Sequence, residues 1–130
     1  MNYETVIGIE IHCELKTKTK MFSSAPVSFG EVANTCVNEI DLGHPGGLPC
    51  VNREAVRLAI KAATALHCTI DPLVRFDRKN YYYSDLPKGF QITQQFHPIG
   101  IGGYVEIDTE EGKKKIRLNR MHMEEDTAKQ

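Results

Sequence analysis

The chain has 130 residues, and its 16 Lys and Arg against 17 Asp and Glu give a formal net charge of -1. This length suits one ordinary globular domain, and the balanced charge argues against a histone-like or polybasic nucleic-acid binder. Hydrophobic residues at 41% and charged residues at 25% exclude a largely disordered chain. The sequence predicts neither a membrane span nor a secretory signal.

Residues 5–15 alternate apolar and polar side chains with the period of a β-strand. The apolar side predicts a core face, made of Ile7, Ile9, Ile11, Cys13 and Leu15. The polar side carries two carboxylates and an imidazole, from Glu10, His12 and Glu14. Such a face could hold Mg²⁺, Mn²⁺ or Zn²⁺, which accept these ligands. Taken alone, the same pattern is more often a strand with a solvated face.

A long loop and a helix follow in the middle of the chain. Residues 34–51 are rich in turn formers and include the sequence Gly-His-Pro-Gly-Gly. This loop lacks the pattern of a phosphate-binding P-loop, so we expect a structural turn. A helix is predicted over residues 53–66, with Asn52 as its N-cap. Its apolar stripe comprises Val56, Ala59, Ile60, Ala63 and Leu66.

Residues 73–83 contain strand-forming side chains around a charged centre, followed by three tyrosines. The adjacent Arg78 and Lys79 could clamp phosphate oxygens, and Tyr81 adds a hydroxyl or stacking surface beside them. The alternative is a charged strand edge with half-buried tyrosines, which is the more common arrangement. Spacing alone leaves both interpretations open.

A hairpin is predicted from residues 104–108 and 115–123, with a turn near Gly112. Three consecutive carboxylates follow, at residues 124–126 just after His122, and they repel one another unless cations neutralise them. The alternatives are half of a metal site and an exposed acidic turn. The order of strand, loop, helix and several strands predicts an α+β domain with a mostly antiparallel sheet.

The cysteines predict no chemistry of their own. Their spacing contains no CxxC pair, so it favours free thiols in a cytoplasmic chain over a zinc site or a disulfide framework. Cys13 and the neighbouring His12 point to opposite sides of the predicted strand, so a cysteine nucleophile is not expected. No Gly-x-Ser-x-Gly sequence offers a serine nucleophile either.

Several segments together resemble one protein family, the B subunits of aspartyl/glutamyl-tRNA amidotransferases. The motifs occur in the family's order along nearly the whole chain. They are residues 4–17 (ETVIGIEIHCELKT), 42–49 (LGHPGGLP), 76–81 (FDRKNY) with 85–92 (DLPKGFQI), and 120–126 (RMHMEED).

The resemblance implies a two-stage reaction. Such a protein uses ATP and Mg²⁺ to phosphorylate the side-chain carboxylate of Glu-tRNA(Gln) or Asp-tRNA(Asn). Ammonia, released from glutamine by a partner amidase (the A subunit) and passed through a channel, then displaces the phosphate, and a small third protein (the C subunit) clasps the other two. The resemblance also implies a catalytic fold like that of glutamine synthetase and guanido kinases, present here in part.

The resemblance assigns roles to individual residues, because phosphoryl transfer depends mainly on the positioning of charge. It places the metal site at Glu10, His12, Glu124 and Glu125. It places the nucleotide phosphates beside Lys79, Arg78 and Tyr81. The residues expected to be catalytic are Lys79, Glu10 and Glu125.

The resemblance also implies where this chain fits. Residues 1–130 would form the N-terminal portion of the catalytic (kinase/transamidase) domain, inactive alone and without the C-terminal helical tRNA-binding parts. The last residues, 127–130, carry no capping or breaker signal, which fits a piece of a longer protein.

Two further points follow from the comparison with the family. Many members carry a four-cysteine zinc knuckle, but the corresponding residues 22–25 and 36–41 keep only Cys36, so we expect no zinc and a loop held by ordinary packing. A rival function is a tRNA-binding or assembly module without its own catalysis. A third is a free-standing metal-binding domain outside any amidotransferase complex.

Overall fold

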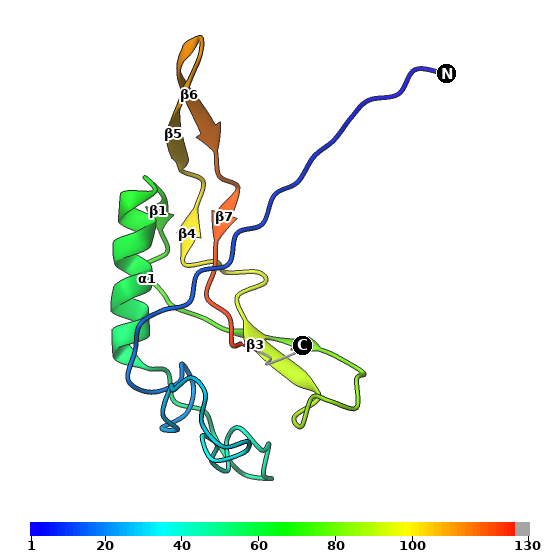
Figure 1. Ribbon diagram of the computed structural model, residues 1–130, viewed down its shortest axis with the longest axis vertical. Coiled ribbons are helices and arrows are strands. Elements are labelled where there is room, and N and C mark those ends of the chain that lie inside the picture. The colour runs from blue at the N-terminus through cyan, green and yellow to red at the C-terminus, as the bar shows by residue number, and fades with distance from the viewer. Residues whose placement is uncertain (127–130) are drawn as a thin grey trace.

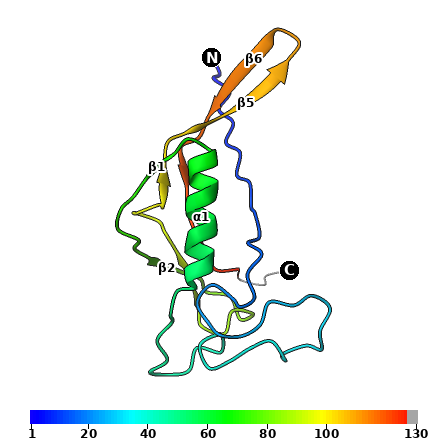
Figure 2. The same cartoon turned by 90° about the vertical axis from the view of Figure 1, so that its left-hand side faces the viewer.

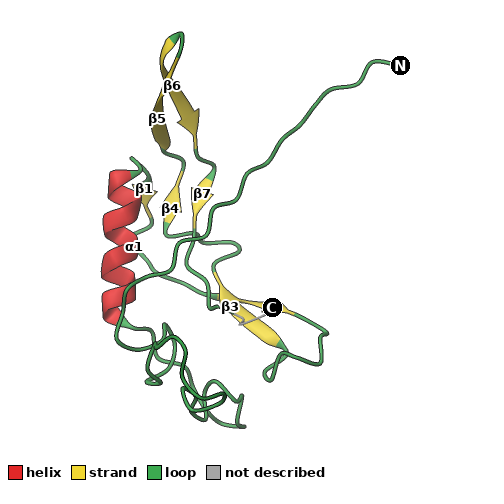
Figure 3. Ribbon diagram, viewed as in Figure 1, coloured by secondary structure: helices red, strands yellow, loops and turns green. Residues whose placement is uncertain are grey.

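A computed structural model describes residues 1–126, so the boundary expected at residues 127–130 lies outside the described part. Figure 1 shows one helix beside a small sheet, with two hairpins extending from them. Figure 3 shows that the chain before the helix is drawn as loop. The elements are α1 (Arg53–Ala65), β1 (Thr69–Ile70), β2 (Asp77–Asn80), β3 (Phe90–Thr93), β4 (Gly100–Ile101), β5 (Tyr104–Thr109), β6 (Gly112–Arg117) and β7 (Arg120–Met121).

All described strand pairs are antiparallel, which confirms the prediction of an α+β fold with antiparallel sheets. One sheet has the order β1-β4-β7, and the other two are the pairs β2-β3 and β5-β6. The predicted hairpin is confirmed as β5-β6, which projects beyond the end of α1 in Figures 1 and 2. The expected strand over residues 115–123 is divided, however. It breaks after Arg117, and β7 pairs with β4 in a different sheet.

Helix α1 begins as the sequence predicts. The Asn52 side chain accepts hydrogen bonds from the backbone N–H of Glu54 at 2.9 Å and of Ala55 at 3.4 Å, which satisfies two free donors of the first turn. The predicted stripe is confirmed in part: Ala59 and Ala63 are buried, Val56 and Leu66 are half-buried, and Ile60 is 38% exposed. The buried residues of the helix are Ala55, Ala59 and Ala63. No helix of residues 1–126 is long and apolar enough to span a lipid bilayer.

The core is joined by one buried amide. Gln94 is fully buried, and its Nε2 donates to the carbonyl of Arg75 at 3.0 Å. Its Oε1 accepts from the backbone N–H of Ile99 at 3.2 Å and of Met123 at 3.0 Å. Ile99 and Met123 are thereby held in the core beside α1, together with Ala55 and Ala59. The hydrogen bond to Met123 therefore fixes the point at which the acidic residues 124–126 leave the core.

The prediction of a core-facing strand over residues 5–15 is wrong for the described chain. This segment is extended but belongs to no strand, and Figure 1 shows it leading away from the helix and sheets. Ile7, Ile9 and Ile11 are 78%, 82% and 88% exposed. An alternating sequence favours extended backbone, but a strand also needs a neighbour to pair its N–H and C=O groups. Residues 1–126 provide none.

The loop before α1 is held by a polar clasp, defined here as Lys20, Ser23, Asn38 and Asp41. The Asp41 carboxylate accepts hydrogen bonds from the Ser23 hydroxyl at 3.0 and 3.1 Å and from the Asn38 N–H at 3.0 Å. The Lys20 ammonium lies 3.4 Å from the same carboxylate. The clasp joins residues 22–25 to residues 36–41, the two stretches at which we expected no zinc to be bound. Charge-assisted hydrogen bonds connect them, and the loop is also held by packing as expected, since Phe22 and Ala25 are buried.

We expect the substitution Asp41→Ala to destabilise this loop by about 1–3 kcal/mol, because it leaves several donors without their acceptor. Hydrogen exchange of residues 20–25 and 38–42 in the intact protein should increase. The control is Glu39→Ala, since Glu39 is exposed in the same loop. Equal hydrogen exchange in the two variants would contradict the role of the clasp in holding the loop. If a metal chelator alone increased the exchange in the unchanged protein, the loop would depend on zinc and our expectation of no zinc would be wrong.

Candidate functional site

Glu124 lies between two imidazoles. Its Oε1 is 3.3 Å from Nδ1 of His12, and its Oε2 is 3.3 Å from Nε2 of His122. The segment after β7 positions Glu124 and His122, while the extended N-terminal segment supplies His12. Two of the predicted metal ligands, His12 and Glu124, are therefore brought together across more than a hundred residues of sequence. The sequence pattern places His122 beside Glu124, and the structure confirms that the two are neighbours, although the resemblance assigned no ligand role to His122.

Lys79 faces this group from β2. Its ammonium lies 5.4 Å from the centre of the Tyr81 ring, so two of the predicted phosphate-binding residues are in contact. The Tyr81 side chain is the main cause that raises the pKa of Lys79, and the carboxylates of Glu124 and Glu10 raise it further. Lys79 therefore stays protonated at neutral pH, and its positive charge faces two of the predicted metal ligands.

Glu125 has a separate environment from Glu124. Its carboxylate forms an ion pair with Lys88, and the two side chains are only 18% and 10% exposed. The second carboxylate oxygen accepts from the backbone N–H of Ile92 at 3.3 Å, and the Glu125 N–H donates to the Ile92 carbonyl at 2.9 Å. Sequence reasoning missed Lys88, because no spacing pattern links it to a residue 37 positions away.

Arg78 is not brought to the Lys79 side. In the β2-β3 ladder Lys79 pairs with Gln91 and Arg78 with Ile92, so their side chains lie on opposite faces. The Arg78 guanidinium instead lies 4.7 Å from the centre of the Phe90 ring. A cation–π contact of this kind holds the side chain against the hairpin.

The donor chemistry of the site suits a hard divalent cation. Glu10 and Glu124 offer carboxylate oxygens, and His12 offers an imidazole nitrogen. Within residues 1–126, however, no three His, Cys, Asp or Glu side chains form a group that could hold a metal ion. The contact of His12 with Glu124 supplies two of the donors, and Glu10 lies on the same exposed segment.

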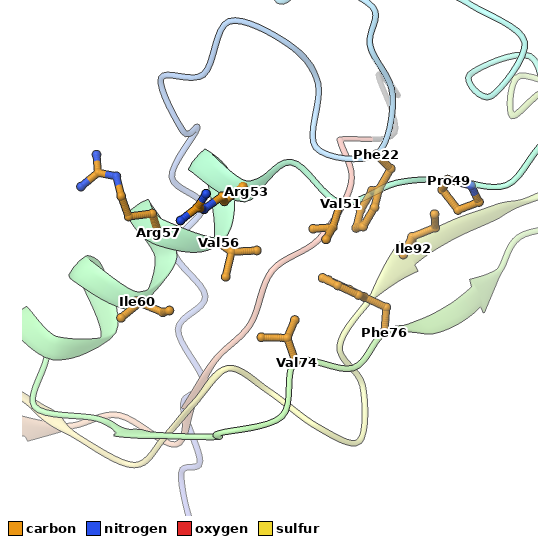
Figure 4. A pocket seen from close by; sticks show the side chains of 10 residues that line it. All are labelled: Phe22, Pro49, Val51, Arg53, Val56, Arg57, Ile60, Val74, Phe76 and Ile92. Atoms are coloured by element: carbon orange, nitrogen blue, oxygen red, sulfur yellow. The ribbon is translucent and has the colours of Figure 1, made fainter.

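A separate apolar groove of about 640 Å³ lies beside α1. Figure 4 shows side chains from α1, from the loop before it, from the segment before β2 and from β3 gathered around it. Its walls are formed mainly by Phe22, Val51, Val56, Ile60, Val74 and Phe76. The described lining includes Arg53 and Arg57 but no carboxylate, and Arg57 is paired with Glu54 at 2.6 Å. The groove therefore lacks the ligands for a metal-bound phosphate.

The Gly-rich loop supports the ion pair of Glu125. A Cβ on Gly43 would lie 2.8 Å from Cγ and 3.2 Å from Cα of Lys88, and the φ of Gly43 is +69°. Only glycine meets both conditions at no cost. The expectation of a structural turn in this loop is confirmed, and the turn packs directly against a residue of the candidate site.

Comparison with known proteins identifies a family whose members are similar to this chain. The profile of the GatB/GatE catalytic domain matches residues 5–130. The B subunit of the aspartyl/glutamyl-tRNA(Asn/Gln) amidotransferase of Mycoplasmopsis agalactiae is 62% identical over 129 residues, which cover 99% of this chain and 27% of that protein. The B subunits of Mycoplasma capricolum subsp. capricolum and Geobacillus thermodenitrificans are 62% and 56% identical over the same shares. The chain thus spans about 27% of the length of these relatives.

We expect Gly43→Ala to destabilise the protein by about 1–3 kcal/mol more than Gly46→Ala, because only the first substitution drives a methyl group into Lys88. Gly46 is the matched control: its φ is +83°, and no atom lies within 4 Å of its added Cβ. Both variants carry a similar backbone cost, so the difference isolates the contact. Denaturant unfolding of the intact protein measures it, and equal losses would show that Lys88 moves aside freely.

Proposed function

The chain belongs to the GatB/GatE catalytic domain family, and from this premise we propose that the whole protein amidates the amino acid of a mischarged tRNA. The substrates are Glu-tRNA(Gln), Asp-tRNA(Asn) or both. The names of the relatives support this proposal, since they are B subunits of aspartyl/glutamyl-tRNA(Asn/Gln) amidotransferases. An aminoacyl-tRNA amidotransferase is a carbon–nitrogen ligase that acts in translation.

The proposed reaction has two steps. The side-chain carboxylate attacks the γ-phosphorus of ATP, which forms an acyl phosphate and releases ADP. Ammonia then attacks the activated carbonyl carbon, the C–O bond to phosphate breaks, and the nitrogen loses one proton to the departing phosphate, which leaves the amide and inorganic phosphate. A carboxylate alone is a poor electrophile, because its leaving group would be an oxide ion. The first step supplies phosphate as the leaving group in its place.

The observation that carries the proposal is the charged Lys79 facing a carboxylate that two histidines hold. A protonated ammonium with a raised pKa can neutralise charge on the transferring phosphoryl group, which is the main requirement of this chemistry. Tyr81 packs against Lys79 and restricts where its ammonium lies. We assign the nucleotide phosphates to Lys79 with Tyr81, whereas Arg78 lies on the opposite face of the same hairpin, beside Phe90.

Glu10, His12, Glu124 and Glu125 are proposed to form the magnesium side. Mg²⁺, when bound, would neutralise the phosphate oxygens opposite Lys79. The two histidines orient Glu124, while Lys88 and the Ile92 amide hold Glu125 in place. The two carboxylates thus have no partner in common among these contacts. Substitution of either one should therefore lower the reaction rate while leaving the contacts of the other intact.

The remaining components are proposals that rest on the relatives. Their designation as B subunits supports partner proteins, for which we propose an amidase (the A subunit) that supplies ammonia from glutamine and a small third protein (the C subunit). Their role in translation supports a cytoplasmic location. We further propose that this chain is the N-terminal portion of a catalytic fold shared with glutamine synthetase and guanido kinases, and that tRNA-binding helical parts lie in the remainder of such a protein.

We predict that Glu10→Gln and Glu125→Gln, each in the full-length protein with its partners, lower ATP-dependent phosphorylation of Glu-tRNA by about 100-fold or more. The affinity for tRNA should stay unchanged, because neither substitution alters a basic residue. Release of ADP that depends on mischarged tRNA measures the first effect, and a filter-binding assay measures the second.

The control for this prediction is Glu4→Gln, which removes an exposed carboxylate from the same N-terminal segment. Full activity of this control would show that the loss of phosphorylation in the two test variants is specific to the candidate site. Unchanged turnover in both test variants would refute the site assignment. It would favour the rival function, a tRNA-binding or assembly module without its own catalysis.

A further inference from the structure

Gln91 joins two parts of the candidate site that lie far apart in the sequence. The Tyr81 hydroxyl donates to its Oε1 at 3.2 Å, and its Nε2 donates to the backbone carbonyl of Glu125 at 2.6 Å. The side chain is nearly buried, at 5% exposure. Both polar atoms of the amide are therefore used, one toward each part.

The position of Gln91 in the sheet explains how it reaches both parts. It pairs with Lys79 in the β2-β3 ladder, so the two side chains share a face of the hairpin. Its neighbour Ile92 forms two hydrogen bonds with Glu125, through its N–H to the carboxylate and through its carbonyl to the backbone. Residues 91 and 92 thus hold the segment after β7 against the strand that carries Lys79.

We propose that Gln91 is a positioning residue that sets the distance between the Lys79–Tyr81 pair and the acidic segment 124–125. This inference rests on the proposed function, in which the first group holds phosphates and the second a metal ion. Gln91 touches neither the reacting atoms nor a metal in this role. It acts through Tyr81 on one side and through the backbone of Glu125 on the other.

The chemistry of the amide restricts which side chains can do this. The contact to Tyr81 needs an acceptor and the contact to the Glu125 carbonyl needs a donor, and a glutamine provides both on one planar group. A glutamate keeps the acceptor but faces the carbonyl with an oxygen. A leucine of similar size leaves two buried polar groups without partners, which is costly. The two replacements therefore separate the contacts.

The test is a double-mutant cycle of Gln91→Leu and Tyr81→Phe in the full-length protein bound to its partners. We expect Gln91→Leu to lower the rate of Glu-tRNA phosphorylation by about 10- to 100-fold, the usual effect of losing an outer-shell partner, with the KM for tRNA unchanged. If Gln91 acts through Tyr81, the double variant should lose much less than the product of the two single losses. Fully multiplicative losses would overturn the coupling.

A readout without catalysis keeps the inference separate from the proposed function. We expect hydrogen exchange of the Glu125 amide to increase in Gln91→Leu and in Gln91→Glu, since both remove the donor to its carbonyl. The control is Gln95→Leu, an exposed glutamine two residues beyond Thr93. Unchanged exchange of the Glu125 amide in both Gln91 variants would refute the positioning role.

The two failures can be told apart. If Glu10→Gln and Glu125→Gln leave phosphorylation intact, the proposed catalytic role of this site fails, whatever the exchange of the Glu125 amide shows. If those variants are inactive but Gln91→Glu behaves like the Gln95→Leu control in both rate and exchange, only the role of Gln91 fails. If Gln91→Leu does not fold, Gln91→Glu alone still tests the positioning role of Gln91.

Discussion

The arrangement of the candidate site depends on the buried amide of Gln94. Three segments meet at this side chain, and each contributes a backbone group that is hydrogen-bonded to it; two of these groups belong to the buried residues Ile99 and Met123. Leaving any of these groups unpaired would cost about 1–3 kcal/mol, so the three segments are held in one relative position. The N–H of Met123 is one of these groups. Met123 is therefore anchored in the core, and the residues that follow it start from a fixed point.

That anchor also separates neighbouring charges. Glu124 and Glu125 are adjacent in the sequence, and their carboxylates would repel each other on one side of the chain. Glu124 is directed to the imidazoles of His12 and His122, whereas Glu125 is directed to the ammonium of Lys88. Each carboxylate gains partners of its own. The repulsion that the sequence indicates is relieved by geometry, without a bound ion being needed for the fold.

Local signals in the sequence predicted local structure. The N-cap at Asn52 and the helix after it follow from neighbouring residues, and so does the β5-β6 hairpin. The contacts that build the site are different, because they depend on how distant segments pack. No spacing pattern predicts the contact of Lys88 with Glu125 or that of Gln91 with Tyr81. By contrast, Lys79, His12 and Glu124 were named from the sequence, and the fold brings them near one another. Periodicity and spacing marked these residues as candidates beside a solvent-exposed alternative, and resemblance to a family decided between the two interpretations.

The two halves of the proposed site differ in how firmly they are built. Lys79, Tyr81 and Glu125 belong to strands and hydrogen-bonded segments of the folded body. Glu10 belongs to an extended segment whose contact with that body, through His12 and Glu124, includes a 75% exposed imidazole. An exposed ion pair contributes at most about 1 kcal/mol, which is less than the entropy of fixing even two residues of backbone. The body therefore sets the proposed phosphate side, whereas the place of Glu10 depends on whatever pairs with the extended backbone of residues 5–15.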